Sequence, residues 1–175
     1  RGAFDFATKP IDMDDLSVTI EKAIEQINFV KETQKEHVAL QSLQSDMETA
    51  GEIQRAILPS TFPPFPELAG KLDIAASMTA AKVIGGDFYD FFRLDEERMG
   101  FVIADVSGKG IPAALFMAVS NTLLRSVALA SEDSAQCMTE VNNLLSRASV
   151  NSMFVTVIYG ILNHKTGEID FTNAG

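Results

Sequence analysis

Residues 82–92 read KVIGGDFYDFF, and residues 101–106 read FVIADV. Each stretch joins an apolar or aromatic run to an aspartate: Asp87 follows two glycines, and Asp105 ends the second run. An unpaired carboxylate in an apolar strand costs roughly several kcal/mol, so the pattern predicts a positive partner. Carboxylates on neighbouring strands can bridge two hard cations, because Mg²⁺ and Mn²⁺ prefer oxygen ligands. We therefore predict a divalent metal site at one end of a sheet.

Around these two stretches, strand patterns alternate with helical patterns. Strands are predicted over residues 71–79, 87–94, 99–106, 153–162 and 167–173, and helices over residues 112–130 and 133–148. Strands joined by short turns, followed by helices and a further hairpin, predict a mixed or antiparallel sheet covered by helices. The fold class is therefore α+β.

The loops next to the two aspartates have an ordinary alternative. Glycine at 85 and 86 lets the backbone bend or approach another segment closely, and Pro112 suits the first turn of a helix. Taken singly, GGD and DVSG are each typical of plain turns. The GKG sequence at residues 108–110 lacks the glycine spacing and the Lys-Ser/Thr pair of a nucleotide-binding P-loop.

A long helical segment precedes these strands. Residues 12–58 contain no proline and a single glycine. Apolar or small residues recur there with 3-4 spacing, in a second phase after residue 38; they are Met13, Leu16, Ile20, Ala23, Ile27 and Val30, then Leu40, Leu43, Met47, Ala50 and Ile57. This spacing is typical of a coiled-coil seam and predicts a parallel homodimer through a helical linker. The alternative is an amphipathic helix that packs on its own domain.

The first residues carry a separate pattern. Residues 1–11, RGAFDFATKPI, predict a turn and a short strand ahead of the helix. They resemble the last strand of a two-component receiver domain, in which Phe6 and Lys9 match the switch aromatic and the phosphate-sensing lysine. The alternative is an ordinary strand-to-helix loop.

Composition excludes several partners. The formal net charge is −10 and no Lys/Arg stripe is present, so nucleic acid and anionic membranes are poor partners. No apolar run reaches the ~20 residues of a membrane span. One cysteine, Cys137, excludes an internal disulfide and favours a reducing, cytoplasmic compartment. The abrupt start and end of the sequence predict a piece of a longer protein.

Taken in order, four blocks resemble the SpoIIE/RsbU branch of the metal-dependent (PPM-type) serine/threonine phosphatases. They are AAKVIGGDFYDFF, FVIADVSGKGIPAALFMA, MFVTVIYGIL and TGEIDFTNAG, and EIQRAILPSTFP before them resembles the family's lead-in. The resemblance covers roughly residues 48–175. It implies an αββα sandwich that is incomplete in this chain, with residues 59–175 forming the N-terminal portion of the phosphatase domain.

The resemblance also implies a dinuclear Mn²⁺ or Mg²⁺ site. Asp87 matches the bridging aspartate, Asp105 matches a second metal-binding aspartate, and Val106 falls where the family offers a backbone carbonyl. Asp90 is interpreted as structural. No catalytic side chain is implied beyond the metal ligands, because two cations activate a water molecule that attacks the phosphoryl group directly.

The implied function is that of a response-regulator output phosphatase. Its substrate would be phosphoserine or phosphothreonine on a regulatory protein such as an anti-sigma-factor antagonist. Family members complete the metal site with further aspartates after the NAG block at residues 173–175. The alternative function is therefore a catalytically silent, phosphatase-like adaptor or binding module in a sigma-factor signalling pathway.

Overall fold

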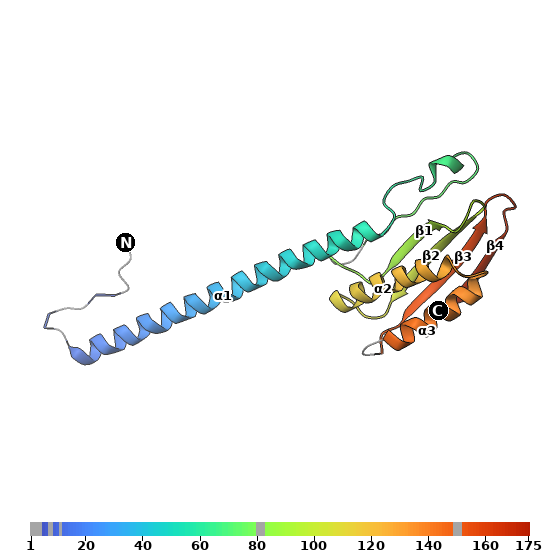
Figure 1. The fold of residues 1–175 in the computed structure, drawn as a ribbon. Coiled ribbons are helices and arrows are strands. Elements are labelled where there is room, and N and C mark those ends of the chain that lie inside the picture. The colour runs from blue at the N-terminus through green and yellow to red at the C-terminus, as the bar shows by residue number, and fades with distance from the viewer. Residues whose placement is uncertain (1–4, 7–8, 11, 80–82, 149–151) are drawn as a thin grey trace. The chain divides into compact units, whose positions relative to one another are not determined.

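A computed structural model describes residues 5–6, 9–10, 12–79, 83–148 and 152–175. The chain divides into two compact units, Arg1–Asp46 and Met47–Gly175, which are described separately below. Figure 1 shows the helices and strands of both units in chain order.

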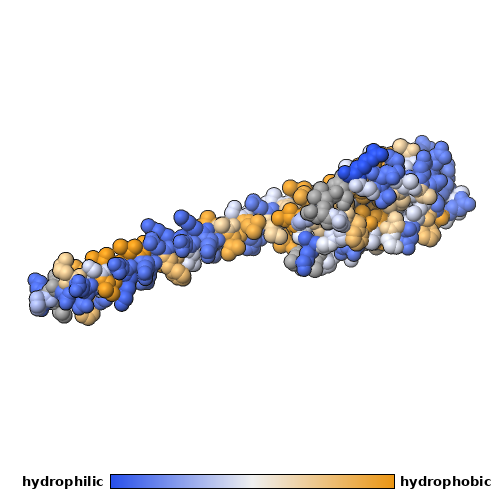
Figure 2. Space-filling view, turned by 90° about the horizontal axis from the view of Figure 1, so that it is seen from below, coloured by the Kyte–Doolittle hydropathy of each residue, from blue (hydrophilic) through white to orange (hydrophobic). Residues whose placement is uncertain are grey.

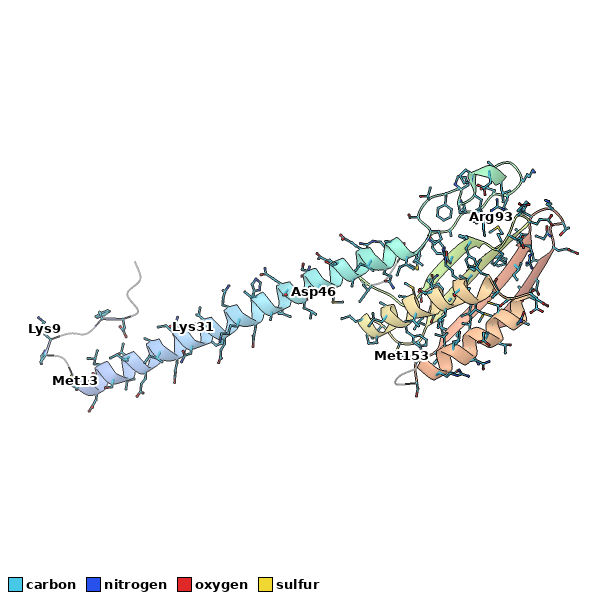
Figure 3. The ribbon with its side chains drawn as sticks, in the orientation of Figure 1. Lys9, Met13, Lys31, Asp46, Arg93 and Met153 are labelled. Carbon is cyan, nitrogen blue, oxygen red and sulfur yellow. The ribbon has the colours of Figure 1, made fainter. Side chains whose placement is uncertain are left out.

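The predicted long helix is confirmed: α1 spans Met13–Ile57 and contributes its last turns to the second unit. The side chain of Asp12 accepts a hydrogen bond from the backbone N–H of Asp14 (2.8 Å), which caps the first turn. Acidic residues in that turn suit the positive end of the helix dipole. Between Met13 and Asp46 the side chains point outward all around the helix (Figure 3).

The first part of α1 carries apolar side chains on its surface. Figure 2 shows apolar residues interleaved with hydrophilic ones along this helix. Ile20, Ile27 and Val30 of the predicted seam are each about half exposed in the single chain (49%, 52% and 57%). The coiled-coil dimer remains a prediction that this exposure motivates.

The second unit is built on one antiparallel sheet, one of the two arrangements (mixed or antiparallel) that the sequence predicted. Its strands lie in the order β1-β2-β3-β4 and each pairs antiparallel with the next. Their bounds are β1 Phe88–Arg93, β2 Arg98–Val106, β3 Val155–Asn163 and β4 Ile169–Ala174. Helices α2 (Ile111–Ala128) and α3 (Ser134–Ala148) lie side by side across one face of the sheet (Figure 1).

The core lies between this face and the two helices. Alternate residues of each strand point into it, so Phe88 and Phe92 of β1 are buried while Tyr89 and Phe91 are half-buried on the other face. The main apolar contributors from the remaining elements are Val102, Val106, Met117, Leu124, Val141, Val157 and Tyr159. The buried Cys137 packs in this core, as its place in the helical pattern predicted.

The predicted strand over residues 71–79 is wrong. Residues 72–79 carry no regular secondary structure, although Leu72, Ile74 and Ala76 alternate half-buried positions with exposed ones. The alternation of apolar and polar residues that suggested a strand reflects only which side chains of this segment pack against the protein. It does not supply a hydrogen-bonded neighbour, and among the described residues β1 pairs with β2 alone.

Helix α2 is, among the described residues, the one helix long and apolar enough to pass a membrane-span test by length and hydropathy. Its buried residues Ala113, Met117, Leu124 and Ala128 belong to the core under the sheet. That packing accounts for the apolar residues on the buried face of α2, whereas Ile111, Leu115 and Val119 are exposed.

Candidate metal centre

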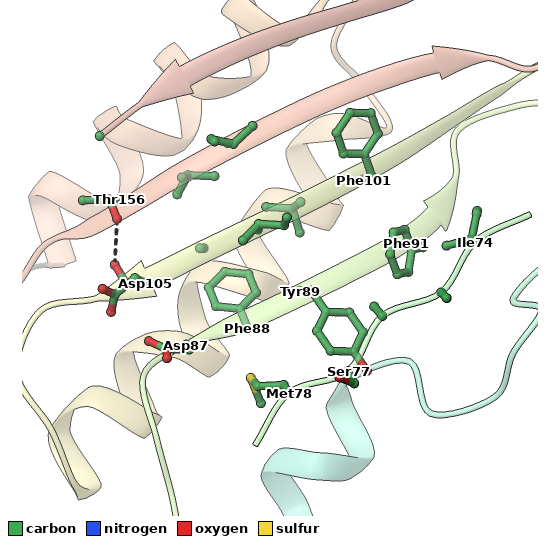
Figure 4. A pocket seen from close by; sticks show the side chains of 18 of the residues that line it. Ile74, Ser77, Met78, Asp87, Phe88, Tyr89, Phe91, Phe101, Asp105 and Thr156 are labelled. Atoms are coloured by element: carbon green, nitrogen blue, oxygen red, sulfur yellow. Dashed lines mark hydrogen bonds between the residues drawn. The ribbon is translucent and has the colours of Figure 1, made fainter. Parts of the chain in front are cut away.

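Asp87 and Asp105 meet at one end of the sheet, as the sequence predicted. Phe88 pairs with Ala104 in the β1–β2 ladder, so Asp87, one residue before β1, comes opposite Asp105 near the end of β2. Figure 4 shows the two carboxyl groups close together at this edge. A hydrogen bond between them, partial burial and the charge of Asp105 raise the pKa of the Asp87 carboxyl above its usual value.

Neither carboxylate lies in the core. Along β2, Phe101, Ile103 and Asp105 face away from the helices, while Val102, Ala104 and Val106 face toward them. Both Asp87 and Asp105 are exposed in the chain. The alternation of the strand therefore carries Asp105 to the open face of the sheet, where an ion could reach it.

Gly86 brings the loop before Asp87 against the end of β2. A Cβ atom at this position would lie 2.9 Å from the Val106 Cβ, 3.0 Å from the Val106 carbonyl oxygen and 3.3 Å from the Ala113 Cβ. Only a residue without a side chain fits such an approach. The predicted role of this glycine is confirmed, and the Val106 carbonyl lies next to the loop that carries Asp87.

The loop that follows β2 is held by Phe154, the residue just before β3. The Ser107 backbone N–H donates to the Phe154 carbonyl (2.9 Å), and the Phe154 N–H donates to the Ser107 hydroxyl (3.0 Å). Gly108 and Gly110 both have positive φ angles (88° and 74°), which allow the chain to turn sharply into α2. The end of β2, which carries Asp105 and Val106, is therefore held by pairing with β3 and by the hydrogen bonds of Ser107 just after it.

Asp90 is the buried carboxylate of this region, with 0% of its surface exposed. It accepts hydrogen bonds from the Asn121 amide (2.9 Å), from Arg125 Nη2 (2.6 Å) and from Arg125 Nε, and also from the Phe91 backbone N–H (2.8 Å). The Arg125 guanidinium also lies over the Phe92 ring, 5.3 Å from its centroid. Asp90 therefore joins β1 to α2, which fits the structural role expected from the sequence.

The last turns of α1 reach the same site through Gln54. Its side-chain amide nitrogen donates to the Gly85 carbonyl (2.5 Å), and its amide oxygen accepts from the Gly85 N–H (3.1 Å). Gln54 is buried, and Gly85 lies two residues before Asp87. The helix is thereby bonded directly to the loop that presents the first carboxylate.

The proline-rich lead-in closes over the outer edge of β1. The Tyr89 hydroxyl donates to the Pro59 carbonyl (3.0 Å), and the Phe62 ring packs against the rings of Tyr89 and Phe91. Arg93 forms an ion pair with Glu67. The segment is irregular, as its prolines predict, and side-chain contacts hold it in place.

A trough of about 920 Å³ runs along the open face of the sheet and ends at the two carboxylates (Figure 4). Ile74, Ser77 and Met78 form one wall beside β1. The floor is mainly apolar, with Tyr89, Phe91, Phe101, Ile103 and Ile158 among its residues.

The donors at this edge fit a hard divalent cation. They are two carboxylates and a nearby backbone carbonyl, all oxygen atoms. Across the part of the chain that the structure describes, no three His, Cys, Asp or Glu side chains cluster as a metal site. Asp87, Asp105 and the Val106 carbonyl are thus the residues that could hold an ion, and they would leave part of its shell to other oxygen atoms.

The other predicted residues belong to the first unit, not to the unit that carries this edge. Phe6 and Lys9 lie in the first unit and are exposed, Phe6 by 88%. Residues 1–4, 7–8 and 11 of the same pattern lie outside the described residues. The receiver-domain assignment therefore stays a prediction.

Sequence reasoning missed Gln54, Asn121 and Arg125. Gln54 follows Ala50 by four residues and so occupies a position of the second seam, where a polar side chain is a signal of a specific contact. No local pattern marks Asn121 and Arg125, because their partner Asp90 lies more than 30 residues away in the sequence.

Comparison with known proteins finds relatives among phosphatases. Residues 95–175 match the family model described as Stage II sporulation protein E (SpoIIE). The phosphoserine phosphatase RsbU of Bacillus subtilis is 32% identical over 145 residues, which cover 81% of this chain and 42% of that protein. The phosphoserine phosphatase RsbP of the same organism is 27% identical over 134 residues, which cover 74% and 32%.

A solved structure shows the same fold. The SiaA-PP2C domain of Pseudomonas aeruginosa superposes with a TM-score of 0.61 at 21% identity, over 78% of this chain and 54% of that one. The chain spans less than half the length of the two curated relatives. The chain is therefore similar to the SpoIIE family over residues 95–175, and its second unit has the fold of a PP2C domain.

Proposed function

We propose that the protein is a metal-dependent phosphatase that removes phosphate from serine or threonine of a regulatory protein, of the anti-sigma-factor antagonist type. The observation that carries the proposal is the facing pair Asp87 and Asp105, exposed at the end of a PP2C-like sheet. The names of the relatives RsbU and RsbP, both phosphoserine phosphatases, support the reaction. Manganese or magnesium is the proposed cofactor, with two ions in the complete domain.

In this proposal the site residues act as metal ligands rather than as nucleophiles. Asp87 would be the ligand that the ions share, Asp105 would hold one of them, and the Val106 carbonyl, which Gly86 leaves accessible, would add a further ligand. When bound, the ions would supply an activated water and offset the charge of the phosphoryl oxygens. Two like charges held together by β1 and β2 are unfavourable without a cation, which favours a metal-binding role over a purely structural one.

The helical linker is proposed to carry a regulatory signal from a receiver domain to the phosphatase domain. Residues 1–11 would end a receiver domain, residues 12–58 would pair with a second copy, and residues 59–175 would form the first part of the phosphatase domain. Gln54 supports such a connection, because it bonds α1 to the backbone two residues before Asp87. A change in the position of α1 would therefore reach the metal ligand through a single residue.

The test is phosphate release by the full-length protein from a phosphoserine protein or from para-nitrophenyl phosphate. We expect release that requires Mn²⁺ or Mg²⁺ and that EDTA abolishes. Release that survives EDTA would contradict the metal mechanism. Absence of release with retained binding of the phosphoprotein would instead support the adaptor alternative.

A further inference from the structure

Four residues form a row across the sheet at the level of the two carboxylates. Asp87 lies opposite Asp105 at the start of β1, and Asp105 pairs with Thr156 of β3. Gly175, directly after β4, continues the row, because a Cβ atom there would lie 2.7 Å from the Thr156 Cβ. The row therefore presents two carboxylates, a hydroxyl and a position without a side chain.

Thr156 is unusual among the residues of its strand. Residues 155–162 read VTVIYGIL, and the alternation of β3 places Thr156 and Ile158 on the open face, away from the helices. Both residues line the trough, but Thr156 is the one beside Asp105. Valine has nearly the same shape and an equal preference for strands, so strand formation alone gives no reason for a hydroxyl here.

The hydroxyl of Thr156 is not committed to the fold. Its partner among the described residues is the backbone carbonyl of Asp105, at 3.4 Å. Hydroxyl hydrogen bonds are ordinarily about 2.5–3.0 Å long. By comparison, the hydroxyls of Thr122 and Thr139 each donate to a carbonyl of their own helix at 2.8 Å. The Thr156 hydroxyl can therefore turn toward another acceptor or donor at little cost.

An ion at the candidate metal centre would need such a polar group nearby. Mg²⁺ and Mn²⁺ prefer about six oxygen ligands and keep several waters, and those waters need polar neighbours. The described residues offer two carboxylates and one carbonyl close by. Thr156 adds a side chain that both donates and accepts hydrogen bonds on the β3 side of Asp105.

We propose that Thr156 is a positioning residue of the metal centre, whose hydroxyl hydrogen-bonds to the hydration shell of an ion held by Asp105. Gly175 keeps the space beside that hydroxyl open. This inference rests on the proposed metal-dependent function. It adds a residue that contacts the water molecules around the ion and does not bind the ion directly. The Thr156 hydroxyl then governs how tightly the ion is held, separately from the stability of the strand.

The experiment is a calorimetric titration of Mn²⁺ into the full-length protein and three variants. Thr156→Val removes the hydroxyl and keeps the shape, Thr156→Ser keeps the hydroxyl, and Thr139→Val makes the same change on α3 as a control. We expect Thr156→Val to weaken Mn²⁺ binding about tenfold or more, as losses of supporting hydrogen bonds at metal sites do. Thr156→Ser and Thr139→Val should stay near the wild-type affinity, and far-UV circular dichroism checks that each variant is folded.

Unchanged Mn²⁺ affinity in Thr156→Val would overturn the inference. So would an equal loss in a folded Thr156→Ser variant, because the shape of the side chain would then be the cause. In both of these outcomes the wild-type protein still binds Mn²⁺ and the proposed function stands. A wild-type protein that binds no Mn²⁺ would overturn the proposed function and this inference together.

Discussion

The side-chain amide of Gln54 forms two hydrogen bonds with the backbone of Gly85, one to its carbonyl and one from its N–H. Gln54 belongs to the last turns of α1, and Gly85 lies two residues before Asp87 in the loop that leads into β1. The pair directly connects the linker helix to the loop that carries Asp87 of the candidate metal centre.

Gln54→Ala should loosen the loop before Asp87. We expect the Gly85 amide to exchange with solvent deuterium about tenfold faster, since it loses its acceptor, and the unfolding free energy to fall by about 1–2 kcal/mol. Hydrogen exchange measured by NMR checks the first and urea unfolding the second. Gln41→Ala, on an exposed position of α1, is the matched control. Unaltered exchange at Gly85 would show that Gln54 does not hold the loop.

Asp90→Asn should destabilise the fold without removing the metal site. The substitution leaves Arg125 without its carboxylate, and breaking a buried pair costs about 3–5 kcal/mol. Because the Arg125 side chain is 43% exposed, we expect a smaller loss of about 2–3 kcal/mol in urea unfolding. Asp73→Asn, an exposed control, should change the unfolding free energy by less than about 0.5 kcal/mol. A stable Asp90→Asn variant with lost Mn²⁺ binding would make Asp90 a ligand instead.

Asp95 gives a pH-dependent contribution at the β1–β2 turn. The side-chain hydrogen bond from Arg98, then the bond from the Glu97 N–H, lower the pKa of Asp95 from 3.8 to about 2. Since the folded pKa lies below the unfolded one, this stabilisation is present above about pH 4 and is lost as the pH falls toward 2. The carboxyl is exposed, so the effect is small and salt-dependent.

The measurement for Asp95 is an NMR titration of its side-chain carboxyl carbon. We expect a midpoint near 2 in the wild type and a shift toward 3.8 in Arg98→Gln. Arg147→Gln, an exposed substitution on α3, should leave the midpoint in place. A wild-type midpoint near 3.8 would show that Arg98 does not hold this carboxylate in solution.

The linker should form the dimer through its first seam. Replacing Leu16, Ile20 and Ile27 with serine removes the apolar seam and should convert the full-length protein from dimer to monomer in sedimentation velocity. Phosphatase output should then no longer respond to receiver phosphorylation. Replacing Val18 and Phe29, which are exposed but outside the seam, is the control. Normal regulation in a monomeric variant would contradict signalling through the helix pair.

The sequence predicted most of the elements because their patterns are local. The 3-4 spacing of α1, the two hairpins and the glycines next to Asp87 each depend on residues close together in the chain. Pairing of the two acidic stretches followed, because strands joined by a short turn bring their far ends together. The bounds observed for the four strands and the two later helices lie within about two residues of the predicted ones, as helix and strand ends usually allow.

What the sequence could not predict depends on distant contacts. Residues 71–79 alternate like a strand, but no local pattern shows whether a partner strand is in place. The sequence likewise does not distinguish a carboxylate on the open face, such as Asp105, from a buried one, such as Asp90. That difference follows from the register of β1 and β2 and from Arg125, which lies 35 residues beyond Asp90.

The proximity of the two carboxylates at the candidate metal centre has a measurable consequence for the stability of the fold. The side-chain hydrogen bond with Asp105, partial burial and the charge of Asp105 raise the pKa of Asp87. In EDTA, Asp87→Asn should therefore unfold at a temperature no lower than the wild type, although it removes a residue of the site. A clear loss of stability in EDTA would show that Asp87 serves the fold.

Mn²⁺ binding by calorimetry is the most direct measurement of the central claim. We predict that the full-length wild-type protein binds Mn²⁺, that Asp87→Asn and Asp105→Asn each lose this binding while staying folded, and that Asp73→Asn binds as the wild type does. Retention of wild-type Mn²⁺ affinity in both Asp87→Asn and Asp105→Asn would contradict the claim that these two carboxylates exist to hold metal ions.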